Sequence, residues 1–173
     1  CVYCHSSVVG EKQREFDMTL ETARKVVDFI FESPNPHLTI EFQGGEPLLN
    51  WDVVRFISQY AKEKAQREKR DLKLIMVSNF TLLDDEKLKI LTEYGVSICT
   101  SFDGPPQVHE HNRIYLGGNS HASVSRWIET ILKAGLPTGA LMTTTRHSLA
   151  YSREIIDEYA RLGLNDVFLR PLH

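Results

Sequence analysis

The feature that most constrains the fold is a regular alternation between short apolar runs and longer amphipathic segments. Five runs of strand length, each followed by polar residues, occupy residues 38–43, 72–77, 96–100, 138–145 and 166–169. Segments with apolar residues at helical spacing precede them, starting at Thr19, Asn50, Asp84, Ser120 or Ser123, and Ser148. This order predicts a parallel sheet covered by helices and joined by right-handed crossovers. The polar segment 106–119 adds no element to this prediction.

The alternation fits a doubly wound sheet or a barrel, and five strands are too few for a closed eight-stranded barrel. In both architectures ligands bind at the carboxyl ends of the strands, where polar residues lie in this sequence. The chain contains no linker and no low-complexity tract. We therefore expect residues 1–173 to form a single domain, which would bury about 70% of the extended-chain surface.

The composition limits the classes of function. A net charge of −3 argues against nucleic-acid binding, which needs a basic surface. No apolar run approaches the roughly 20 residues of a membrane span, so we expect no membrane partner. Two of the three cysteines lie close together at one end. That pattern indicates metal or redox chemistry in the cytoplasm and not a disulfide framework.

Cys1 and Cys4 form a C-x-x-C pair whose thiolates can bind a metal. From these residues alone, several interpretations stay open. With His5 the pattern is C-x-x-C-H, which attaches c-type haem in exported, usually helical proteins. A zinc site would need further ligands, for which His109 and His111 are candidates, and a thioredoxin-like redox pair would need a strand directly before a helix. The cysteines could also have no function.

The second motif is an apolar run that stops at two glycines, IEFQGGEP at residues 40–47. Glycine lets the backbone come close to a bound molecule because no Cβ intervenes. Glu46 can pair with a cationic group, and Pro47 stiffens the exit from the turn. We interpret the two motifs together: the cysteines hold a metal centre, and the glycine turn holds a small molecule beside it.

In this order, the motifs resemble those of radical S-adenosylmethionine (SAM) enzymes. CVYC at 1–4 resembles the second half of their C-x-x-x-C-x-aromatic-x-C signature, and QGGEP at 43–47 resembles their second motif. Further motifs resemble the peptide-modifying branch that includes anaerobic sulfatase maturases: SN at 78–79, TLL at 81–83, and SFDGP at 101–105 with His109 and Arg113. SPNPH at 33–37, MTTT at 142–145 and FLRPL at 168–172 resemble maturases of the His-Xaa-Ser system.

The resemblance implies a fold and two cofactors. The fold would be α/β, a partial (β/α)6 TIM-type barrel truncated at both ends. The cofactors would be S-adenosylmethionine and a [4Fe–4S] cluster, which suits soft thiolate ligands. Cys1 and Cys4 would be two of the three cluster ligands, and we expect the third before Cys1, in a longer enzyme of which this chain is a core fragment. With two thiolates alone, the fragment should retain a cluster poorly.

The same resemblance implies which residues bind the cofactor. Tyr3 would lie near the adenine edge, the two glycines and Glu46 near the methionine amino group, and Arg113 at the SAM carboxylate, which an arginine can bind through two hydrogen bonds. The other candidates stand at strand ends, near the ribose and the substrate. The full set is Tyr3, Gln43, Gly44, Gly45, Glu46, Ser78, Asn79, Ser101, Asp103 and Arg113.

The function implied is that of a radical SAM maturase acting on a peptide or small protein. Its cluster, reduced by an external electron donor, would cleave SAM to a 5′-deoxyadenosyl radical that abstracts hydrogen from the substrate. The sequence names no catalytic side chain. Two other classes stay open: a c-type haem electron carrier, and an inactive βα scaffold that binds a partner peptide.

Overall fold

The computed structural model describes residues 1–4 and 14–171. They divide into two compact units: unit I comprises residues 1–4, 78–82 and 98–171, and unit II comprises residues 14–77 and 83–97. His5 of the haem alternative and Leu172 of the FLRPL motif lie outside the described residues. The strands follow the order of the chain, β1-β2-β3-β4-β5. That residues 1–173 form a single domain stays a prediction.

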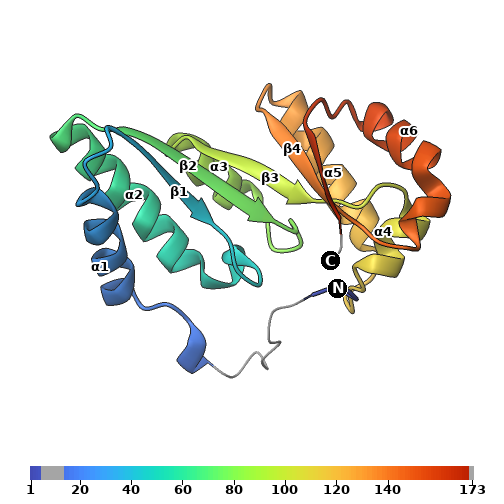
Figure 1. Cartoon of the computed structure of the whole chain (residues 1–173), viewed down its shortest axis with the longest axis horizontal. Coiled ribbons are helices and arrows are strands. Elements are labelled where there is room, and N and C mark those ends of the chain that lie inside the picture. The colour runs from blue at the N-terminus through green and yellow to red at the C-terminus, as the bar shows by residue number, and fades with distance from the viewer. Residues whose placement is uncertain (5–13, 172–173) are drawn as a thin grey trace. The chain divides into compact units, whose positions relative to one another are not determined.

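Unit II contains two strands with helices beside them (Figure 1). Its elements are η1 (Arg14–Phe16), α1 (Leu20–Phe31), β1 (His37–Phe42), η2 (Pro47–Asn50), α2 (Trp51–Glu68), β2 (Asp71–Ser78, whose last residue belongs to unit I) and α3 (Asp85–Glu93). β1 and β2 pair in parallel, from His37 opposite Asp71 to Phe42 opposite Met76. Along β1, buried and exposed residues alternate, as the two-residue period of a strand covered on one face requires.

The helix starts in unit II follow the expected capping chemistry in two cases out of three. The hydroxyl of Thr19 accepts a hydrogen bond from the backbone N–H of Thr22 at 3.1 Å, and Asp84 caps α3 in the same way. Asn50 occupies the N-cap position of α2 but makes no capping bond. Its amide donates instead to the carbonyl of Met18 at 2.9 Å, so the expected position is right and the expected mechanism is wrong.

Unit I carries the remaining strands and helices. They are β3 (Val96–Ser101, whose first two residues belong to unit II), α4 (Pro106–Asn112), α5 (Ser120–Lys133), β4 (Thr138–Thr144), η3 (Ser148–Tyr151), α6 (Ser152–Leu162) and β5 (Val167–Pro171). β4 lies between β3 and β5 and pairs with both in parallel. The buried core includes Phe102, Ile128, Ile131, Ala140 and Met142.

Two expectations for unit I need correction. The polar segment that added no element contains α4, which starts with proline at its first turn, a position where the missing N–H costs no helical hydrogen bond. Helix α5 is capped by Asn119, whose side chain accepts from the N–H of Ala122 at 2.7 Å, and not by a serine. At the last helix, Ser148 opens the short helix η3, and α6 begins only at Ser152.

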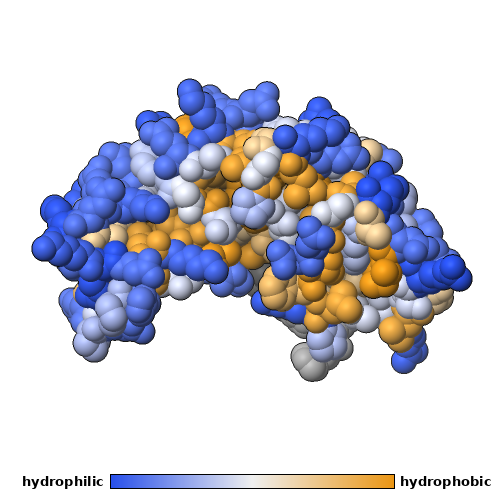
Figure 2. All heavy atoms as spheres, turned by 90° about the horizontal axis from the view of Figure 1, so that it is seen from above, coloured by the Kyte–Doolittle hydropathy of each residue, from blue (hydrophilic) through white to orange (hydrophobic). Residues whose placement is uncertain are grey.

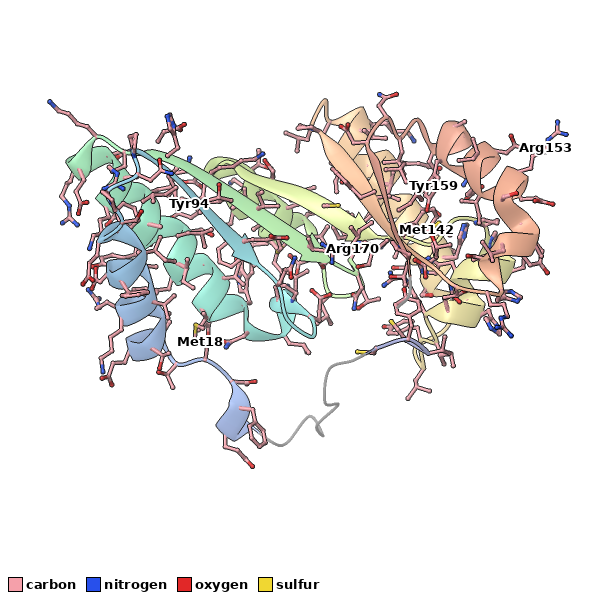
Figure 3. All side chains as sticks on the ribbon, viewed as in Figure 1. Met18, Tyr94, Met142, Arg153, Tyr159 and Arg170 are labelled. Carbon is pink, nitrogen blue, oxygen red and sulfur yellow. The ribbon has the colours of Figure 1, made fainter. Side chains whose placement is uncertain are left out.

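The surface mixes hydrophobic and hydrophilic residues, as Figure 2 shows for one face. In unit I, Arg153 extends away from α6, whereas Tyr159 of the same helix is buried and donates its hydroxyl hydrogen bond to the carbonyl of Phe102 at 2.8 Å (Figure 3). Among the described residues, no helix combines the length and the apolar character needed to cross a membrane.

Candidate functional site

The two cysteines lie in one turn of unit I. The N–H of Cys4 donates to the carbonyl of Cys1 at 3.2 Å, and the N–H of Val2 donates to the carbonyl of Asn112 at the end of α4, at 2.9 Å. Both thiols are exposed. The structure therefore presents two soft sulfur donors from one backbone turn, which is the donor type that iron–sulfur clusters prefer.

Asp103 is the polar centre of this part of unit I, and its side chain is fully buried. One carboxylate oxygen, Oδ2, accepts from the hydroxyl of Tyr3 at 2.7 Å. The other, Oδ1, accepts from the N–H of Thr143 at 3.1 Å and from Nη2 of Arg113 at 3.1 Å. Two predicted site residues, Tyr3 and Arg113, thus meet at a third.

Arg113 extends from the end of α4 toward both the carboxylate and the cysteine turn. Its Nε lies 3.0 Å from Oδ2 of Asp103, so that the ion pair uses two nitrogens of the guanidinium. Its Nη1 lies 4.0 Å from Sγ of Cys1, and its Cζ lies 5.3 Å from the centre of the Tyr3 ring. The guanidinium therefore connects the buried carboxylate with the exposed thiol.

Burial shifts the titration of two groups beside Asp103. It raises the pKa of Tyr3 above its ordinary value; Arg113 acts against this shift and the Asp103 carboxylate acts with it. Burial lowers the pKa of His109 to about 3, and the positive charge of Arg113 and interaction with His121 lower it further. At neutral pH, Tyr3 is consequently a hydrogen-bond donor and His109 an uncharged ring.

The sequence reasoning missed two contributions to this arrangement. Nδ1 of His109 accepts from the N–H of Asp103 at 3.2 Å, so this histidine supports Asp103 and is not arranged as the zinc ligand considered above. The N–H of Thr143, at the end of β4, donates to the Asp103 carboxylate. His109 stood within the motif that carries the resemblance, but nothing in the sequence signalled that a backbone N–H of Thr143 would take part.

The other strand-end candidates in unit I have local roles. Ser78 accepts a hydrogen bond from the N–H of Phe80 at 3.0 Å, and Asn79 accepts from the N–H of Thr81 at 2.9 Å. These contacts shape the turn after β2. Ser101 is the half-buried last residue of β3, opposite Leu141 of β4. Their proposed contacts with the ribose or substrate stay predictions.

The glycine turn belongs to unit II and follows the carboxyl end of β1. Gly44 has a φ of +150°, and a Cβ added at Gly44 or Gly45 would meet no atom within 4 Å. Glu46 accepts from the N–H of Leu48 at 3.1 Å, and Gln43 donates to Glu41 at 2.5 Å. The backbone of the two glycines is accordingly open to an approaching molecule, which is the property that the sequence predicted for it.

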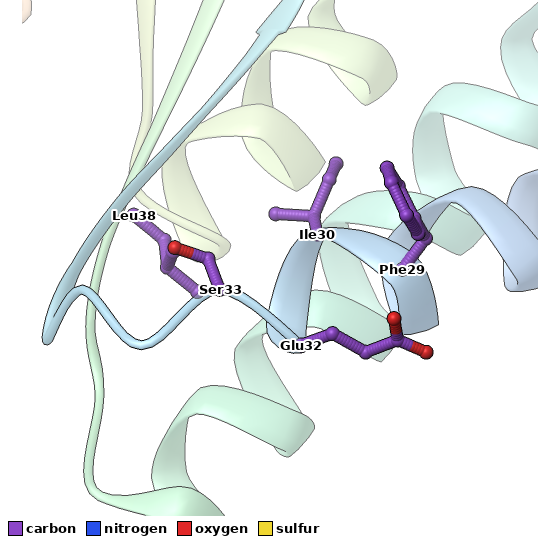
Figure 4. Close-up of a pocket in the computed structure, with 5 residues that line it drawn as sticks. All are labelled: Phe29, Ile30, Glu32, Ser33 and Leu38. Atoms are coloured by element: carbon purple, nitrogen blue, oxygen red, sulfur yellow. The ribbon is translucent and has the colours of Figure 1, made fainter.

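An open pocket of about 510 Å³ in unit II is not this site (Figure 4). It is lined by Phe29, Ile30, Glu32, Ser33 and Leu38. These residues come from the end of α1 and the amino end of β1, and the glycines follow the opposite end of the strand. Ligands of parallel α/β folds bind at the carboxyl ends of strands, so the position of this pocket does not match the predicted site.

Within the described residues, no group of three or more His, Cys, Asp or Glu side chains is placed to hold a metal ion. The two cysteines fit the expected partial ligand set of an iron–sulfur cluster. The family model for the radical SAM superfamily matches residues 1–159. The chain belongs to the radical SAM superfamily. This membership favours the iron–sulfur interpretation of Cys1 and Cys4 over the haem alternative.

Individual relatives agree with the family. The chain is 29% identical over 166 residues to a protein of Methanothermobacter thermautotrophicus, covering 95% of this chain and 60% of that protein. It is 26% identical over 161 residues to the cysteine-type anaerobic sulfatase-maturating enzyme of Clostridium perfringens, covering 90% of this chain and 43% of the enzyme. The chain thus spans about half the length of the curated relatives it matches.

Solved structures show the fold. Anaerobic sulfatase-maturating enzyme as histidine-tagged anSMEcpe with bound AdoMet matches with a TM-score of 0.87 at 21% identity, covering all of this chain and 46% of that one. The same enzyme with bound AdoMet and a peptide matches with a TM-score of 0.82 at 22% identity, covering 90% and 43%. The predicted partial TIM-type barrel is confirmed, and family and neighbours imply a [4Fe–4S] cluster and S-adenosylmethionine as cofactors.

Proposed function

We propose that this radical SAM protein is a maturase that modifies a peptide or small protein, and that unit I supplies its cysteine turn. The single observation that carries the proposal is the pair of exposed thiols in one turn, with Nη1 of Arg113 at 4.0 Å from Cys1. When bound, the reduced cluster and SAM would supply a 5′-deoxyadenosyl radical that removes hydrogen from the substrate. An external electron donor is part of the proposal.

The residues of this chain would bind and orient. Cys1 and Cys4 would donate thiolates to the cluster. Arg113 would direct a guanidinium N–H group toward the SAM carboxylate, and Tyr3 would lie at the adenine edge. The open backbone of Gly44 and Gly45 would accept the methionine part of SAM, whose positive charge the Glu46 carboxylate would offset. Gln43, Ser78, Asn79 and Ser101 complete the proposed set.

A peptide substrate is supported by similarity to the sulfatase-maturating enzyme and to its structure with a bound peptide. The narrower assignment to a His-Xaa-Ser system rests on the sequence motifs alone and stays a prediction. We also place the protein in the cytoplasm, where the thiols that the cluster needs remain reduced.

The test uses the full-length protein, reconstituted anaerobically with iron and sulfide, then given SAM and a reductant. We expect 5′-deoxyadenosine to form. Cys1→Ala and Cys4→Ala should abolish both the broad iron–sulfur absorbance and the product. Cys99→Ala, at a half-buried position inside β3, is the matched control and should keep both.

Two results would count against the proposal. If no 5′-deoxyadenosine forms from a protein that holds a cluster, the inactive scaffold is the better interpretation. If the purified protein shows a sharp haem band that survives denaturation, the haem carrier is the better one. Modification of a candidate peptide, followed by mass spectrometry, would then identify the substrate class.

A further inference from the structure

We propose that Asp103 is a positioning residue that holds the cysteine turn and the guanidinium of Arg113 in one fixed arrangement. This inference rests on the proposed function, because it concerns how the same site is built. The resemblance had placed Asp103 beside the ribose or the substrate. The contacts within unit I give it a different role.

The first step is the saturation of the carboxylate. An ionised carboxylate offers about four acceptor positions. Asp103 receives the hydroxyl of Tyr3, the N–H of Thr143, and Nη2 and Nε of Arg113, at 2.7, 3.1, 3.1 and 3.0 Å. With its side chain fully buried, Asp103 has its capacity met by groups of its own chain. It therefore acts on a ligand through the residues that it holds.

The second step concerns the cysteine turn. Tyr3 lies between Cys1 and Cys4, and its hydroxyl is bonded to a residue 100 positions away in sequence. The other described tether of this turn to the rest of unit I is the bond from the N–H of Val2 to the carbonyl of Asn112. Two tethers, one on each side of the backbone step, restrict rotation of the turn. Without the Tyr3 bond, the thiols would keep only the backbone tether.

The third step concerns Arg113. Asp103 binds the edge of the guanidinium that carries Nε and Nη2, and the planar fork leaves Nη1 directed elsewhere. Nη1 lies 4.0 Å from Sγ of Cys1. The same carboxylate thus fixes the thiol-bearing turn through Tyr3 and turns a charged donor toward that thiol. A ligand bound at Cys1 would meet a preorganised guanidinium, which lowers the entropy lost on binding.

The test compares Tyr3→Phe and Asp103→Asn with Tyr60→Phe. Tyr60 is a matched control in unit II, because its half-buried hydroxyl also donates to an aspartate, Oδ1 of Asp28, at 2.8 Å. In the apo protein, hydrogen exchange at the amides of Val2 and Cys4 should accelerate about ten-fold or more in Tyr3→Phe, since a hydrogen bond to a charged group is lost. Tyr60→Phe should leave this exchange unchanged.

In the reconstituted protein, Asp103→Asn should raise the dissociation constant for SAM at least about ten-fold, because a neutral amide no longer orients Arg113. It should also weaken the change that SAM causes in the electron paramagnetic resonance spectrum of the reduced cluster. Circular dichroism establishes whether each variant is folded. If Asp103→Asn does not fold, Tyr3→Phe decides the outcome by the same two readouts.

Equal exchange in the three variants, or wild-type SAM affinity in a folded Asp103→Asn, would overturn the inference. Failure of the wild-type protein to hold a cluster or to cleave SAM is a different result. It would reject the proposed function, and the exchange measurement on the apo protein would still decide whether Asp103 positions the turn.

Discussion

Nδ1 of His109 accepts a hydrogen bond from the backbone N–H of Asp103 at 3.2 Å, so an uncharged imidazole supports the residue on which Tyr3 and Arg113 converge. The acceptor role of Nδ1 places the ring proton on Nε2. Protonation of Nδ1 would set one donor against another inside a buried cluster. The arrangement of Asp103 therefore depends on His109 remaining neutral.

This dependence predicts acid sensitivity of the apo protein. The pKa of His109 is about 3 in the folded state, against about 6.5 for an unperturbed histidine. Between these values the unfolded state binds more protons, so His109 contributes stability that is complete above about pH 6.5 and is lost as the pH falls toward 3. The expected slope is about 1.4 kcal/mol per pH unit in that window, measured by urea unfolding.

His109→Gln supplies the comparison for this slope. The glutamine carbonyl can accept from the N–H of Asp103 and does not titrate. Carboxylates elsewhere contribute to acid unfolding in both proteins, so the informative quantity is the difference between the two slopes. Identical slopes between pH 6.5 and 4 would show that His109 is not a buried neutral ring.

The two glycines after β1 should respond differently to alanine. Gly44 has a φ of +150°, which an L residue rarely adopts, so Gly44→Ala should cost about 1–3 kcal/mol of stability. Gly45 does not have such a φ, and its added methyl would meet no atom within 4 Å. Gly45→Ala should therefore fold normally, with stability changed by less than about 1 kcal/mol. Urea unfolding of the apo protein measures both.

Affinity for SAM should be lost where stability is kept. The methyl of Gly45→Ala would fill space that the proposed function gives to the methionine part of SAM. We expect at least a ten-fold higher dissociation constant in the reconstituted protein, or about 1.4 kcal/mol. Wild-type affinity in Gly45→Ala would show that SAM does not approach this backbone.

Gly104 connects Asp103 to the chain that leads into α4, and it has no room for a side chain. A Cβ there would lie 2.9 Å from Cγ1 and 3.3 Å from the Cα of Ile155, and the φ is +91°. Gly104→Ala should destabilise the protein by about 2–4 kcal/mol, from backbone strain and overpacking together. Thermal or urea unfolding of the apo protein provides the measurement.

Gly118→Ala separates the two causes. Gly118 has a φ of +122° but open space around its Cβ position, so its substitution should show strain alone. Combining Gly104→Ala with Ile155→Ala should recover the part that comes from crowding, as a coupling energy in a double-mutant cycle. A cycle without coupling would mean that strain explains the whole loss at Gly104.

The sequence was sufficient for the strands because each apolar run is short, strongly apolar and bounded by turn residues. It was insufficient for α4, since Pro106–Asn112 is only seven residues long and mostly polar, with Val108, His109 and Asn112 buried. Helical periodicity needs a longer window than that to be visible. The burial of a histidine and an asparagine there comes from tertiary contacts.

The same limit applies to the candidate site. Residue types and strand ends pointed to Tyr3, Asp103 and Arg113 one by one. That they bind one another could not be predicted, because Tyr3 and Asp103 are 100 residues apart and the third donor is the backbone N–H of Thr143. A pattern of side chains indicates where polar groups gather; the fold decides which of them hold the ligand and which hold each other.

Glu46 allows the charge of a side chain to be separated from its role in the turn. Its carboxylate caps η2 by accepting from the N–H of Leu48 at 3.1 Å. Glu46→Gln keeps an oxygen acceptor and should change stability by less than about 0.5 kcal/mol, whereas Glu46→Ala removes the cap and should cost about 1 kcal/mol. Both should weaken SAM binding about ten-fold or more, because each removes the negative charge that faces a cation. If Glu46→Gln instead binds SAM as the wild type does and only Glu46→Ala is impaired, the shape of the turn and not its charge holds the ligand.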